Sequence, residues 1–529
     1  MPLPSPRRAE EYARKAAELV LRQTGAAPEM RAARRLAAQA PTVAATGPRI
    51  LVLTPRNWAA HVQIEAMLAQ ALRLRGAEVS FLTCGGGLEI CDRSNTYEAP
   101  PMPCGTCTRY VEASIDAHGF PRSSLRQGWE AEDPLPWPAL DEVPVRELLD
   151  VEDDGLPIGR LVDIPLKWFL CAASLDDEPL AGGTGRAFLW SARRIARGVE
   201  RALDGVRPDT VLLLSGLFVF EAVAWAACRK RGIDVVTYER AFRTDTLVFS
   251  RRVPAGFYDL TDQWGLEDRP LSEEEEDELY AYLATRRRGD AADQYWSFDR
   301  SGRADGPAGS GRLAVLFTNL TWDTAVIGRN RAFPDIRPWL DRVIAEFVAR
   351  PSHRLVIRVH PSEVRLPMKQ TRDSLERYIA ERHPDLPANI EVVGARHPTD
   401  TYGLIDSCDI GLVYTSTTGL ELALVGKPVV VAGDVHYRDK GFTVDLADAG
   451  GLSRALDVGL EDPAALHADV DAARRYAHFF WFRGPVKAPF VTEPLPGLAR
   501  LTTTDLADLR PGTSPEVDRI CDLILKGAG

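Results

Sequence analysis

Short apolar runs alternate with amphipathic stretches along most of this chain. The runs have the length of buried strands and fall at 49–54, 78–83, 210–214 and 234–237, then at 313–317, 355–359, 410–414 and 429–432. Stretches with helical spacing separate them, including 59–75, 218–231 and 420–426. Strands that alternate with helices in this way form parallel sheets. The pattern therefore predicts an α/β protein with two successive βα arrays.

The length of 529 residues is too great for one hydrophobic core, so two large domains are expected. The predicted division is a helical extension at 1–46, a first α/β domain at 47–300 with a loop-rich insertion at 84–160, a Gly-rich linker at 301–311, a second α/β domain at 312–470, and C-terminal helices at 471–529 that return toward the first domain. The acidic helix expected at 272–288 is interpreted as a solvated face without chemistry.

A hydroxyl-rich turn follows the predicted strand 410–414. Its sequence is Thr415-Ser-Thr-Thr-Gly419, and it opens directly onto a predicted helix that ends at Gly426. Backbone N–H groups and the positive end of a helix dipole converge at such a point, and hydroxyls add further hydrogen bonds. The turn therefore suits a phosphate group, although an ordinary N-cap of Ser and Thr would look the same.

A histidine follows the predicted strand 355–359. Pro361 prevents the strand from continuing, which places His360 at the carboxyl end of the strand. Open α/β sheets bind their ligands at this edge. An imidazole there can give a hydrogen bond or a proton to a phosphate leaving group. A single histidine is more often structural, but the nearby hydroxyl turn favours a functional site.

Several motifs of the second domain resemble the capsule polysaccharide biosynthesis family. They are Arg358-Val-His-Pro-Ser-Glu363, Tyr414-Thr-Ser-Thr-Thr-Gly-Leu-Glu421, Gly426-Lys-Pro428, Gly433-Asp-Val-His-Tyr-Arg-Asp-Lys-Gly-Phe-Thr443 and Asn319-Leu-Thr-Trp-Asp323. The family is similar to bacterial Kdo transferases, which have the GT-B glycosyltransferase fold. The resemblance is strongest over residues 311–445 and implies two Rossmann-like domains with a nucleotide sugar bound between them.

The resemblance implies a donor site in the second domain. His360 would contact the nucleotide phosphate and assist its departure, while the turn residues Ser416, Thr417, Thr418 and Gly419 would hold the phosphate. Glu421 would accept hydrogen bonds from ribose hydroxyls, unless it is only a carboxylate favoured by the helix dipole. Arg358, Asn319 and Asp323 are further candidates for contact with the donor, but Arg358 could instead be paired or exposed, and Asn319 and Asp323 could instead cap a loop. The resemblance favours a CMP-activated acidic sugar such as Kdo, with a UDP-sugar as the alternative.

The first domain is expected to bind the acceptor, a glycan or glycolipid, and to supply the remaining catalytic group. Glu239 follows the strand 234–237 and could act as base, nucleophile or electrostatic stabiliser, or could merely pair with Arg243. After the strand 49–54, Arg56, Trp58 and His61 could contact an anionic acceptor, as could Arg243. No Asp-x-Asp motif lies in a suitable loop, so no divalent ion is expected for catalysis.

Four of the eight cysteines lie close together in the sequence. Cys84, Cys91, Cys104 and Cys107 have the spacing C-x6-C-x12-C-x2-C, with glycines that allow tight turns. Four thiolates could hold a structural zinc ion or, as the second choice, an iron–sulfur cluster. The family used for comparison is not expected to need such a site.

Composition narrows the remaining function classes. There are 64 basic and 75 acidic residues, a net charge of −11, which argues against a nucleic-acid partner bound through bulk positive charge. No apolar run is long enough to span a bilayer, and no signal peptide precedes the first domain. A cytoplasmic protein is therefore expected, with peripheral contact to the membrane surface as an option. The sequence does not indicate an oligomeric state.

Three alternatives share these features. A nucleotide-sugar epimerase also uses two Rossmann-like domains, and a polyol-phosphate transferase similar to teichoic-acid polymerases also uses His-Pro and hydroxyl motifs. A non-catalytic assembly protein would use the cysteine segment and the N-terminal helices to bind a partner.

Overall fold

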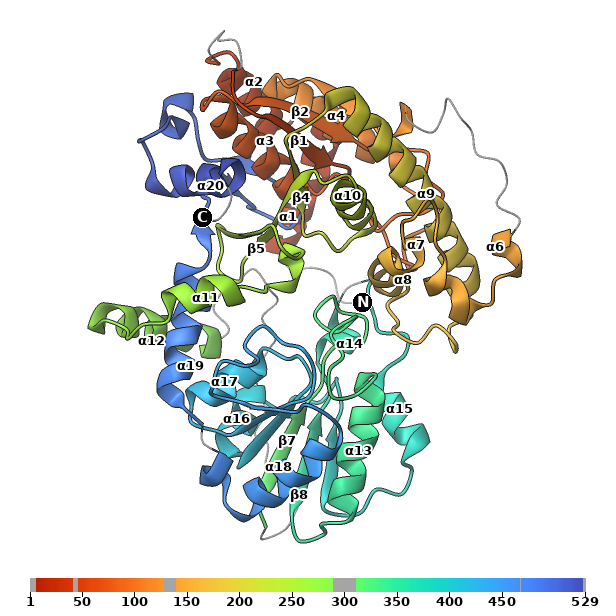
Figure 1. Ribbon diagram of the computed structural model, residues 1–529, viewed down its shortest axis with the longest axis vertical. Helices are drawn as coiled ribbons and strands as arrows, with labels where there is room; N and C mark the ends of the chain where they lie inside the picture. Colours follow the sequence, from red (N-terminus) through yellow and green to blue (C-terminus); the bar gives the residue numbers. More distant parts are fainter. Residues whose placement is uncertain are drawn as a thin grey trace.

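Two separate sheets, the first mostly parallel and the second entirely parallel, organise the computed structural model of this protein (Figure 1). The structure describes residues 6–40, 46–127, 139–288, 311–366, 368–466 and 468–526. Residues 301–310 of the predicted linker lie outside this description.

The first sheet has the strand order β13-β6-β5-β4-β1-β2-β3. Its strands in chain order are β1 (Arg49–Thr54), β2 (Glu78–Thr83), β3 (Arg122–Ser124), β4 (Thr210–Leu214), β5 (Asp234–Arg240) and β6 (Thr246–Ser250). The first five strands are parallel, and β6 pairs with β5 in the antiparallel sense. Alternate residues of β1 enter different cores on the two faces of the sheet: Ile50 and Val52 on one, Leu51 and Leu53 on the other.

The helices between residues 6 and 288 pack around the first sheet, except the last two α-helices, which pack against α19 (Val470–His478). They are α1 (Pro6–Gln23), α2 (Pro28–Ala37), α3 (Ala59–Arg73), α4 (Cys104–His118), α6 (Ala139–Glu142), α7 (Ile158–Leu161), α8 (Asp163–Leu170), α9 (Ala181–Val206), α10 (Val219–Lys230), α11 (Thr261–Glu267) and α12 (Glu273–Arg288), with 3-10 turns at Val145–Asp150 and Ala255–Phe257. The segment 84–160 is not merely a loop-rich insertion, because α4 and β3 form the third βα unit of the sheet.

The second sheet has the order β12-β11-β10-β7-β8-β9, and all its strands are parallel. They are β7 (Leu313–Phe317), β8 (Arg354–Arg358), β9 (Ile390–Val393), β10 (Ile410–Val413), β11 (Val429–Val431) and β12 (Val444–Asp445). Counted within the domain, this is the Rossmann order 6-5-4-1-2-3, in which the direction of winding reverses between β7 and β10. The predicted fold class of two Rossmann-like domains in a GT-B arrangement is confirmed.

The helices of the second domain include one that is as short as the sequence predicts. They are α13 (Ile336–Val348), α14 (Ser362–Arg365), α15 (Leu375–Arg382), α16 (Thr401–Ser407), α17 (Thr418–Leu424) and α18 (Gly450–Glu461), followed by a 3-10 turn at Pro463–Leu466. The helix after the hydroxyl turn, α17, has only seven residues. This length agrees with the predicted stretch 420–426, although α17 begins two residues earlier, at Thr418.

The C-terminal part of the chain crosses back to the first domain. Helix α19 (Val470–His478) continues into a π-helical turn (Phe479–Arg483), and β13 (Val486–Lys487) then pairs with β6 of the first sheet. The remaining elements are the β14–β15 pair (Val491–Thr492 and Arg500–Leu501), a 3-10 turn (Leu506–Leu509) and α20 (Pro515–Leu525), which packs against α3 and β4. In Figure 1, α11, α12 and α19 lie together beside the junction of the two domains.

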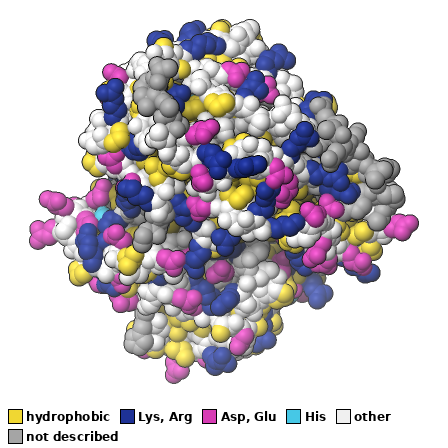
Figure 2. Space-filling view, turned by 45° about the horizontal axis from the view of Figure 1, so that its top comes forward, with side chains coloured by type: hydrophobic (Ala, Val, Ile, Leu, Met, Phe, Trp, Pro, Cys, Tyr) yellow, Lys and Arg dark blue, Asp and Glu magenta, His cyan; other side chains and the backbone are white. Residues whose placement is uncertain are grey.

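The N-terminal helices pack on the body of the first domain. Met30, Ala33 and Leu36 of α2 are fully buried, and α2 lies against α4. Elsewhere, acidic and basic side chains are intermixed over the face shown in Figure 2. Among the described helices, none combines the length and apolar character needed to cross a bilayer.

Candidate active site

His360 lies at the carboxyl end of β8, as the sequence predicts. Its backbone N–H donates to Thr318 Oγ1 (2.9 Å), and its Nδ1 accepts a hydrogen bond from the backbone N–H of Ser362 (3.1 Å). That bond selects the neutral tautomer in which Nε2 carries the proton. Burial and the neighbouring charge of Arg358 lower the pKa of His360 to about 4. At neutral pH the imidazole is therefore an uncharged hydrogen-bond donor.

Arg358 is the last residue of β8 and is only 3% exposed. Its guanidinium donates to the carbonyl oxygens of Gly394 (2.8 Å) and Thr399 (3.3 Å), while its Nε has no hydrogen-bond partner. Burial and the like charge of Arg365 lower its pKa to about 10. Asp400 and Glu376 raise the pKa in turn but do not offset burial and Arg365, so a further anion would be favoured here.

The hydroxyl turn lies opposite His360, at the carboxyl end of β10. Ser416 Oγ accepts from the backbone N–H of Thr418 (3.3 Å) and hydrogen-bonds to Thr418 Oγ1 (3.1 Å). The backbone N–H of Thr415 donates to Asn319 Oδ1 (3.3 Å), so the buried Asn319 ties the loop after β7 to the turn. This hydrogen bond occupies the amide oxygen of Asn319, a residue that was predicted to contact the nucleotide-sugar donor.

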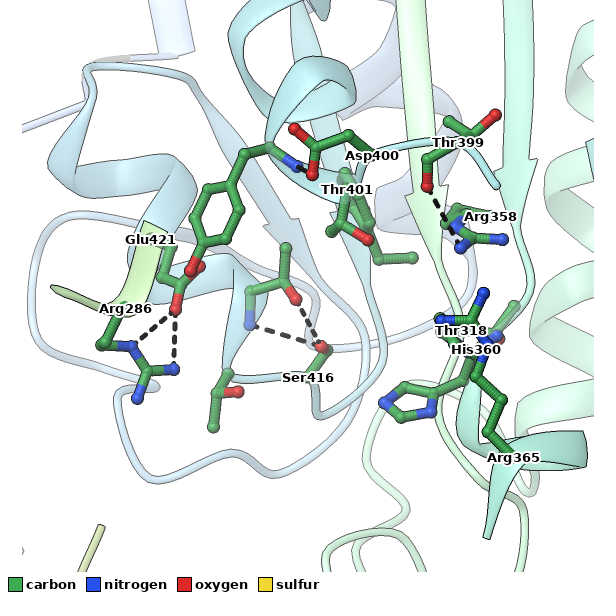
Figure 3. Close-up of a pocket in the computed structure, with 15 residues that line it drawn as sticks. Arg286, Thr318, Arg358, His360, Arg365, Thr399, Asp400, Thr401, Ser416 and Glu421 are labelled. Atoms are coloured by element: carbon green, nitrogen blue, oxygen red, sulfur yellow. Dashed lines mark hydrogen bonds and ion pairs between the residues drawn. The ribbon is translucent and has the colours of Figure 1, made fainter. Parts of the chain in front are cut away.

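A cavity of ≈ 170 Å³ joins His360 to the turn, and Figure 3 shows them on opposite sides of it. Its lining comes from the carboxyl ends of β7, β8 and β10, the edge where a Rossmann-like sheet binds its ligands. The predicted residues that line it are Arg358, His360, Ser416, Thr417, Thr418 and Glu421. Gly419 is buried behind the turn, against the hydroxyl group of Tyr437.

Helix α12 contributes to this cavity, contrary to the prediction of a solvated face without chemistry. Arg286 lines the cavity and donates to Glu421 Oε1 from Nε (3.0 Å) and Nη2 (2.7 Å). Glu421 is therefore held by an ion pair in which both side chains are largely buried. A role in binding ribose hydroxyls would use the carboxylate oxygen that faces away from Arg286.

Sequence reasoning missed other lining residues. These are Phe317, Thr318, Pro361, Arg365, Thr399, Asp400, Thr401 and Tyr402. Thr318 could have been found, since it directly follows the predicted strand 313–317. Asp400 caps α16 by accepting from the backbone N–H of Tyr402, a signal of a helix start and not of a site. Arg286 and Arg365 have no local signal of function.

Three predicted acceptor residues gather in the first domain. Arg56, Trp58 and His61 line a small cavity together with Glu65 and Glu221. Arg56 is buried, however, and forms ion pairs with Asp92 (2.8 Å) and with Glu221. Burial opposes its charge, but these two carboxylates outweigh burial and raise the pKa of Arg56. These ion pairs already balance the charge of Arg56, which weakens the case for contact with an anionic acceptor; that role stays a prediction.

A buried hydrogen-bond network lies beneath this cavity. Glu65 accepts from Thr54 Oγ1 (2.6 Å) and from the hydroxyl group of Tyr238 (3.0 Å), and His61 Nδ1 lies 3.3 Å from the same hydroxyl group. Burial raises the pKa of Glu65 to about 8 and lowers that of His61 to about 3. At neutral pH both groups are therefore largely uncharged.

Glu239 and Arg243 do not form the ion pair that was the alternative to a catalytic role for Glu239. Glu239 Oε1 accepts from the backbone N–H of Arg240 (2.8 Å), and burial raises the pKa of Glu239. The guanidinium of Arg243 lies over the ring of Phe482, 4.1 Å from its centroid. A raised carboxyl pKa is compatible with a base, which leaves the catalytic role of Glu239 a prediction.

Asp323 lies near the junction of the domains and does not line the cavity of His360. Burial raises its pKa, and the nearby charge of Lys369 opposes the rise. Lys369 Nζ in turn lies 3.3 Å from the ring centroid of Trp168 in the first domain. Next to it, Arg372 forms a two-pronged ion pair with Glu178 (2.8 Å for each contact), which ties the domains together.

The four clustered cysteines are free thiols, and Cys84, Cys91 and Cys107 are buried. Burial raises the pKa of Cys84 to about 12. Within the described part of the chain, no three His, Cys, Asp or Glu side chains are arranged to hold a metal ion. This arrangement does not support the predicted zinc or iron–sulfur site, which stays a prediction that metal analysis of the purified protein tests.

The match to a known protein family lies in the second half of the chain. Residues 276–456 match the family described as capsule polysaccharide biosynthesis protein. Among curated proteins, none matches the sequence significantly.

Similar solved structures include two KpsC enzymes from Thermosulfurimonas dismutans. The beta Kdo 2,4 transferase is 16% identical with a TM-score of 0.37, over 57% of this chain and 87% of its own. The beta Kdo 2,7 transferase is 14% identical with a TM-score of 0.35, over 59% and 88%. A UDP-GlcNAc 2-epimerase from Neisseria meningitidis is 10% identical with a TM-score of 0.25, over 82% and 100%.

The fold assignment rests on the two sheets described above and not on these distant likenesses. The family match, in contrast, covers the residues that carry His360, the hydroxyl turn and Arg286. For residues 276–456, the predicted resemblance to the capsule polysaccharide biosynthesis family is thereby confirmed.

Proposed function

We propose that this protein is a glycosyltransferase that moves a sugar from a nucleotide donor to a surface-polysaccharide or glycolipid acceptor. The observation that carries the proposal is the cavity between His360 and the turn residues Ser416–Thr418, at the carboxyl edge of a sheet with Rossmann strand order. The match of this region to the capsule polysaccharide biosynthesis family supports the same function.

Transfer breaks the bond between the anomeric carbon of the sugar and a phosphate oxygen, so negative charge develops on the departing phosphate. The Nε2–H of His360 would donate a hydrogen bond to that phosphate, and the hydroxyl groups of the turn would donate others. The charge of Arg358 would stabilise the anion, because its hydrogen bonds go to backbone carbonyls and the nearby Asp400 and Glu376 offset the effect of burial and Arg365 only in part. Donors fixed in advance in a site with little water stabilise such charge strongly.

The donor is proposed to carry more than one negative charge. Arg358 and Arg365 both line the cavity, and the charge of Arg365 lowers the pKa of Arg358. A CMP-activated acidic sugar, with one phosphate and one carboxylate, would bring two negative charges to these two cations, and the diphosphate of a UDP-sugar is the alternative. These arginines would supply positive charge that a divalent ion supplies in other transferases, in line with the predicted transfer without such an ion.

The acceptor is proposed to bind at the first domain. Trp58 and His61 line its small cavity, and Glu239 would take the proton of the attacking hydroxyl group. Peripheral contact with a membrane surface remains part of the proposal for a glycolipid acceptor. The epimerase, polyol-phosphate transferase and assembly-protein alternatives have no observation that favours them over transfer.

The test combines ligand binding with one substitution and a matched control. Wild-type protein is screened against CMP, UDP, GDP and CDP ligands by thermal shift, where a ligand at a hundred times its Kd adds about 2.7 kcal/mol of stability. His360→Ala should lower turnover of the selected donor roughly 100- to 1,000-fold, as loss of a charge-stabilising donor does.

The control is His353→Ala, because His353 precedes β8 and so lies at the opposite end of the same strand. This variant should keep full turnover. If no nucleotide stabilises the wild-type protein, or if both variants lose turnover equally, the proposed function is wrong. Conversion of a nucleotide sugar without an acceptor would show an epimerase, and release of CMP from CDP-glycerol would show a polyol-phosphate transferase.

A further inference from the structure

Tyr437 holds the hydroxyl turn from behind. Its side chain is fully buried, and its hydroxyl group donates to the backbone carbonyl of Ser416 (2.6 Å). The same carbonyl accepts the backbone N–H of Gly419 (3.1 Å), which closes the turn. A side chain at position 419 would collide with the Tyr437 hydroxyl group, so glycine is needed for this contact. Tyr437 thus fixes the part of the backbone that presents the hydroxyls to the cavity.

The neighbouring residue, His436, fastens this contact to the helix that crosses between the domains. Its Nδ1 lies 2.9 Å from the hydroxyl group of Tyr476 on α19, and that hydroxyl group donates to the backbone carbonyl of His436 (2.7 Å). The His436 ring also stacks on Phe480, with centroids 3.9 Å apart and planes at 8°. We call α19 and the following π-helical turn (residues 470–483) the crossing segment. It therefore holds both the backbone and the side chain of His436.

The crossing segment reaches aromatic side chains of the first domain. The ring centroid of Phe480 lies 5.3 Å from that of Phe242 and 6.3 Å from that of Tyr258. The ring centroid of Tyr476 lies 5.2 Å from that of Trp264. Buried side chains of both domains belong to one hydrophobic cluster here. A continuous packed path therefore joins the first domain to the carbonyl of Ser416.

We propose that Tyr437 is a positioning residue for donor binding, and that His436 couples the hydroxyl turn to the crossing segment. The packing of α19 on the first domain would then set how well the turn accepts a donor phosphate. The donor part of this inference rests on the proposed function, whereas the positioning of the turn does not.

The first experiment removes one hydroxyl group and compares two buried tyrosines. Tyr437→Phe should raise amide hydrogen exchange in peptides that cover residues 415–420 roughly 5-fold, because the Ser416 carbonyl loses one of its two donors. It should also weaken nucleotide binding roughly 5- to 10-fold, with kcat at saturating donor nearly unchanged.

The matched control is Tyr414→Phe. Tyr414 is also fully buried and immediately precedes the turn, but its hydroxyl group bonds to Asn330 Oδ1 (2.8 Å) instead. This variant should lose stability without a change in exchange at 415–420 or in nucleotide affinity. Equal effects of the two substitutions on exchange and affinity would show that Tyr437 acts only through general stability, which would overturn the proposal.

The second experiment tests the coupling with a double-mutant cycle. Tyr476→Phe removes the hydroxyl group that holds His436, and it should increase exchange at 415–420 roughly 2- to 5-fold although it lies on another element. Combined with Tyr437→Phe, the effects should be less than additive because both act through one path. Full additivity, or no effect of Tyr476→Phe on the turn, would refute the coupling.

Hydrogen exchange separates this proposal from the proposed function. If the wild-type protein binds no nucleotide, the sugar-transfer proposal fails, yet exchange in ligand-free protein still decides whether Tyr437 positions the turn. If nucleotides bind and Tyr437→Phe changes neither exchange nor affinity, the positioning proposal fails while the proposed function stands.

Discussion

Each domain of this protein buries an arginine at the carboxyl edge of its sheet, but the two arginines are compensated in opposite ways. Arg56, just after β1, is paired with Asp92 and Glu221, and these carboxylates raise its pKa. Arg358, at the end of β8, bonds to two backbone carbonyls, and burial with a neighbouring arginine lowers its pKa to about 10.

The difference indicates which edge is prepared for an anion. A buried charge that already has its counter-charges holds a structure together, because a further anion would have to displace one of them. A buried charge with only dipolar partners gains most from a ligand of opposite sign. We therefore propose that an arginine at the carboxyl edge serves as a structural tie in the first sheet and as a ligand-binding group in the second.

The largest expected effect is on the stability of the first domain. Arg56→Met should lower the free energy of unfolding by about 3–5 kcal/mol, because it leaves the carboxylates of Asp92 and Glu221 buried without a counter-charge. Chemical denaturation of the two proteins at neutral pH measures this difference.

The control also replaces the carboxylates of Asp92 and Glu221, which Arg56→Met leaves buried without a counter-charge. The triple substitution Arg56→Met, Asp92→Asn, Glu221→Gln should recover much of the lost stability, since neutral side chains cost less to bury. A loss of less than about 1 kcal/mol for Arg56→Met alone, typical of exposed pairs, would contradict a structural role for this arginine.

A second effect concerns the pH dependence of stability. Burial raises the pKa of Glu65 to about 8, above its unfolded value, so the folded state binds more protons than the unfolded state between these values. The stability that Glu65 contributes is thus complete below its unfolded pKa and is lost as the pH rises toward 8. Relative to Glu65→Gln, wild-type protein should lose about 1.4 kcal/mol per pH unit across pH 5–7.

Denaturation of both proteins at pH 5, 6 and 7 gives this slope, and Glu78→Gln is the matched control because Glu78 is exposed at the start of β2. The control should show no slope of this kind. If the difference in unfolding free energy between wild type and Glu65→Gln did not change with pH, the first-domain cavity would be open to water. The contrast between the two domains would then disappear.

The strands and two sides of the donor cavity could be predicted because their signals are local. The run before Pro361 gives both β8 and the place of His360, and the run before Thr415 gives β10 and the hydroxyl turn. Because the carboxyl ends of parallel strands share one edge of a sheet, the meeting of His360 and the hydroxyl turn at a single cavity could also be predicted from the sequence.

Pairing between distant residues could not be predicted in the same way. Arg56 meets Asp92 across 36 positions and Glu221 across 165, so nothing near Arg56 in the sequence shows that its charge is balanced. Arg286 meets Glu421 across 135 positions, and a helix rich in acidic residues concealed that contact. The third βα unit was missed because the glycines, prolines and cysteines around α4 resemble those of a loop.

The smallest effect, and the sharpest test of the comparison, concerns Arg358. Arg358→Met should leave the free energy of unfolding within about 1 kcal/mol of wild type, because no carboxylate loses an ion-pair partner. The same substitution should weaken binding of the donor nucleotide by about 2 kcal/mol, roughly 30-fold. Isothermal titration with the nucleotide, beside denaturation of the same samples, separates the two quantities. Arg354→Met at the opposite end of β8 is the control and should bind normally. If Arg358→Met instead lost several kcal/mol of stability and kept its affinity, Arg358 would be a structural tie like Arg56, and the second domain would have no uncompensated charge to offer a phosphate.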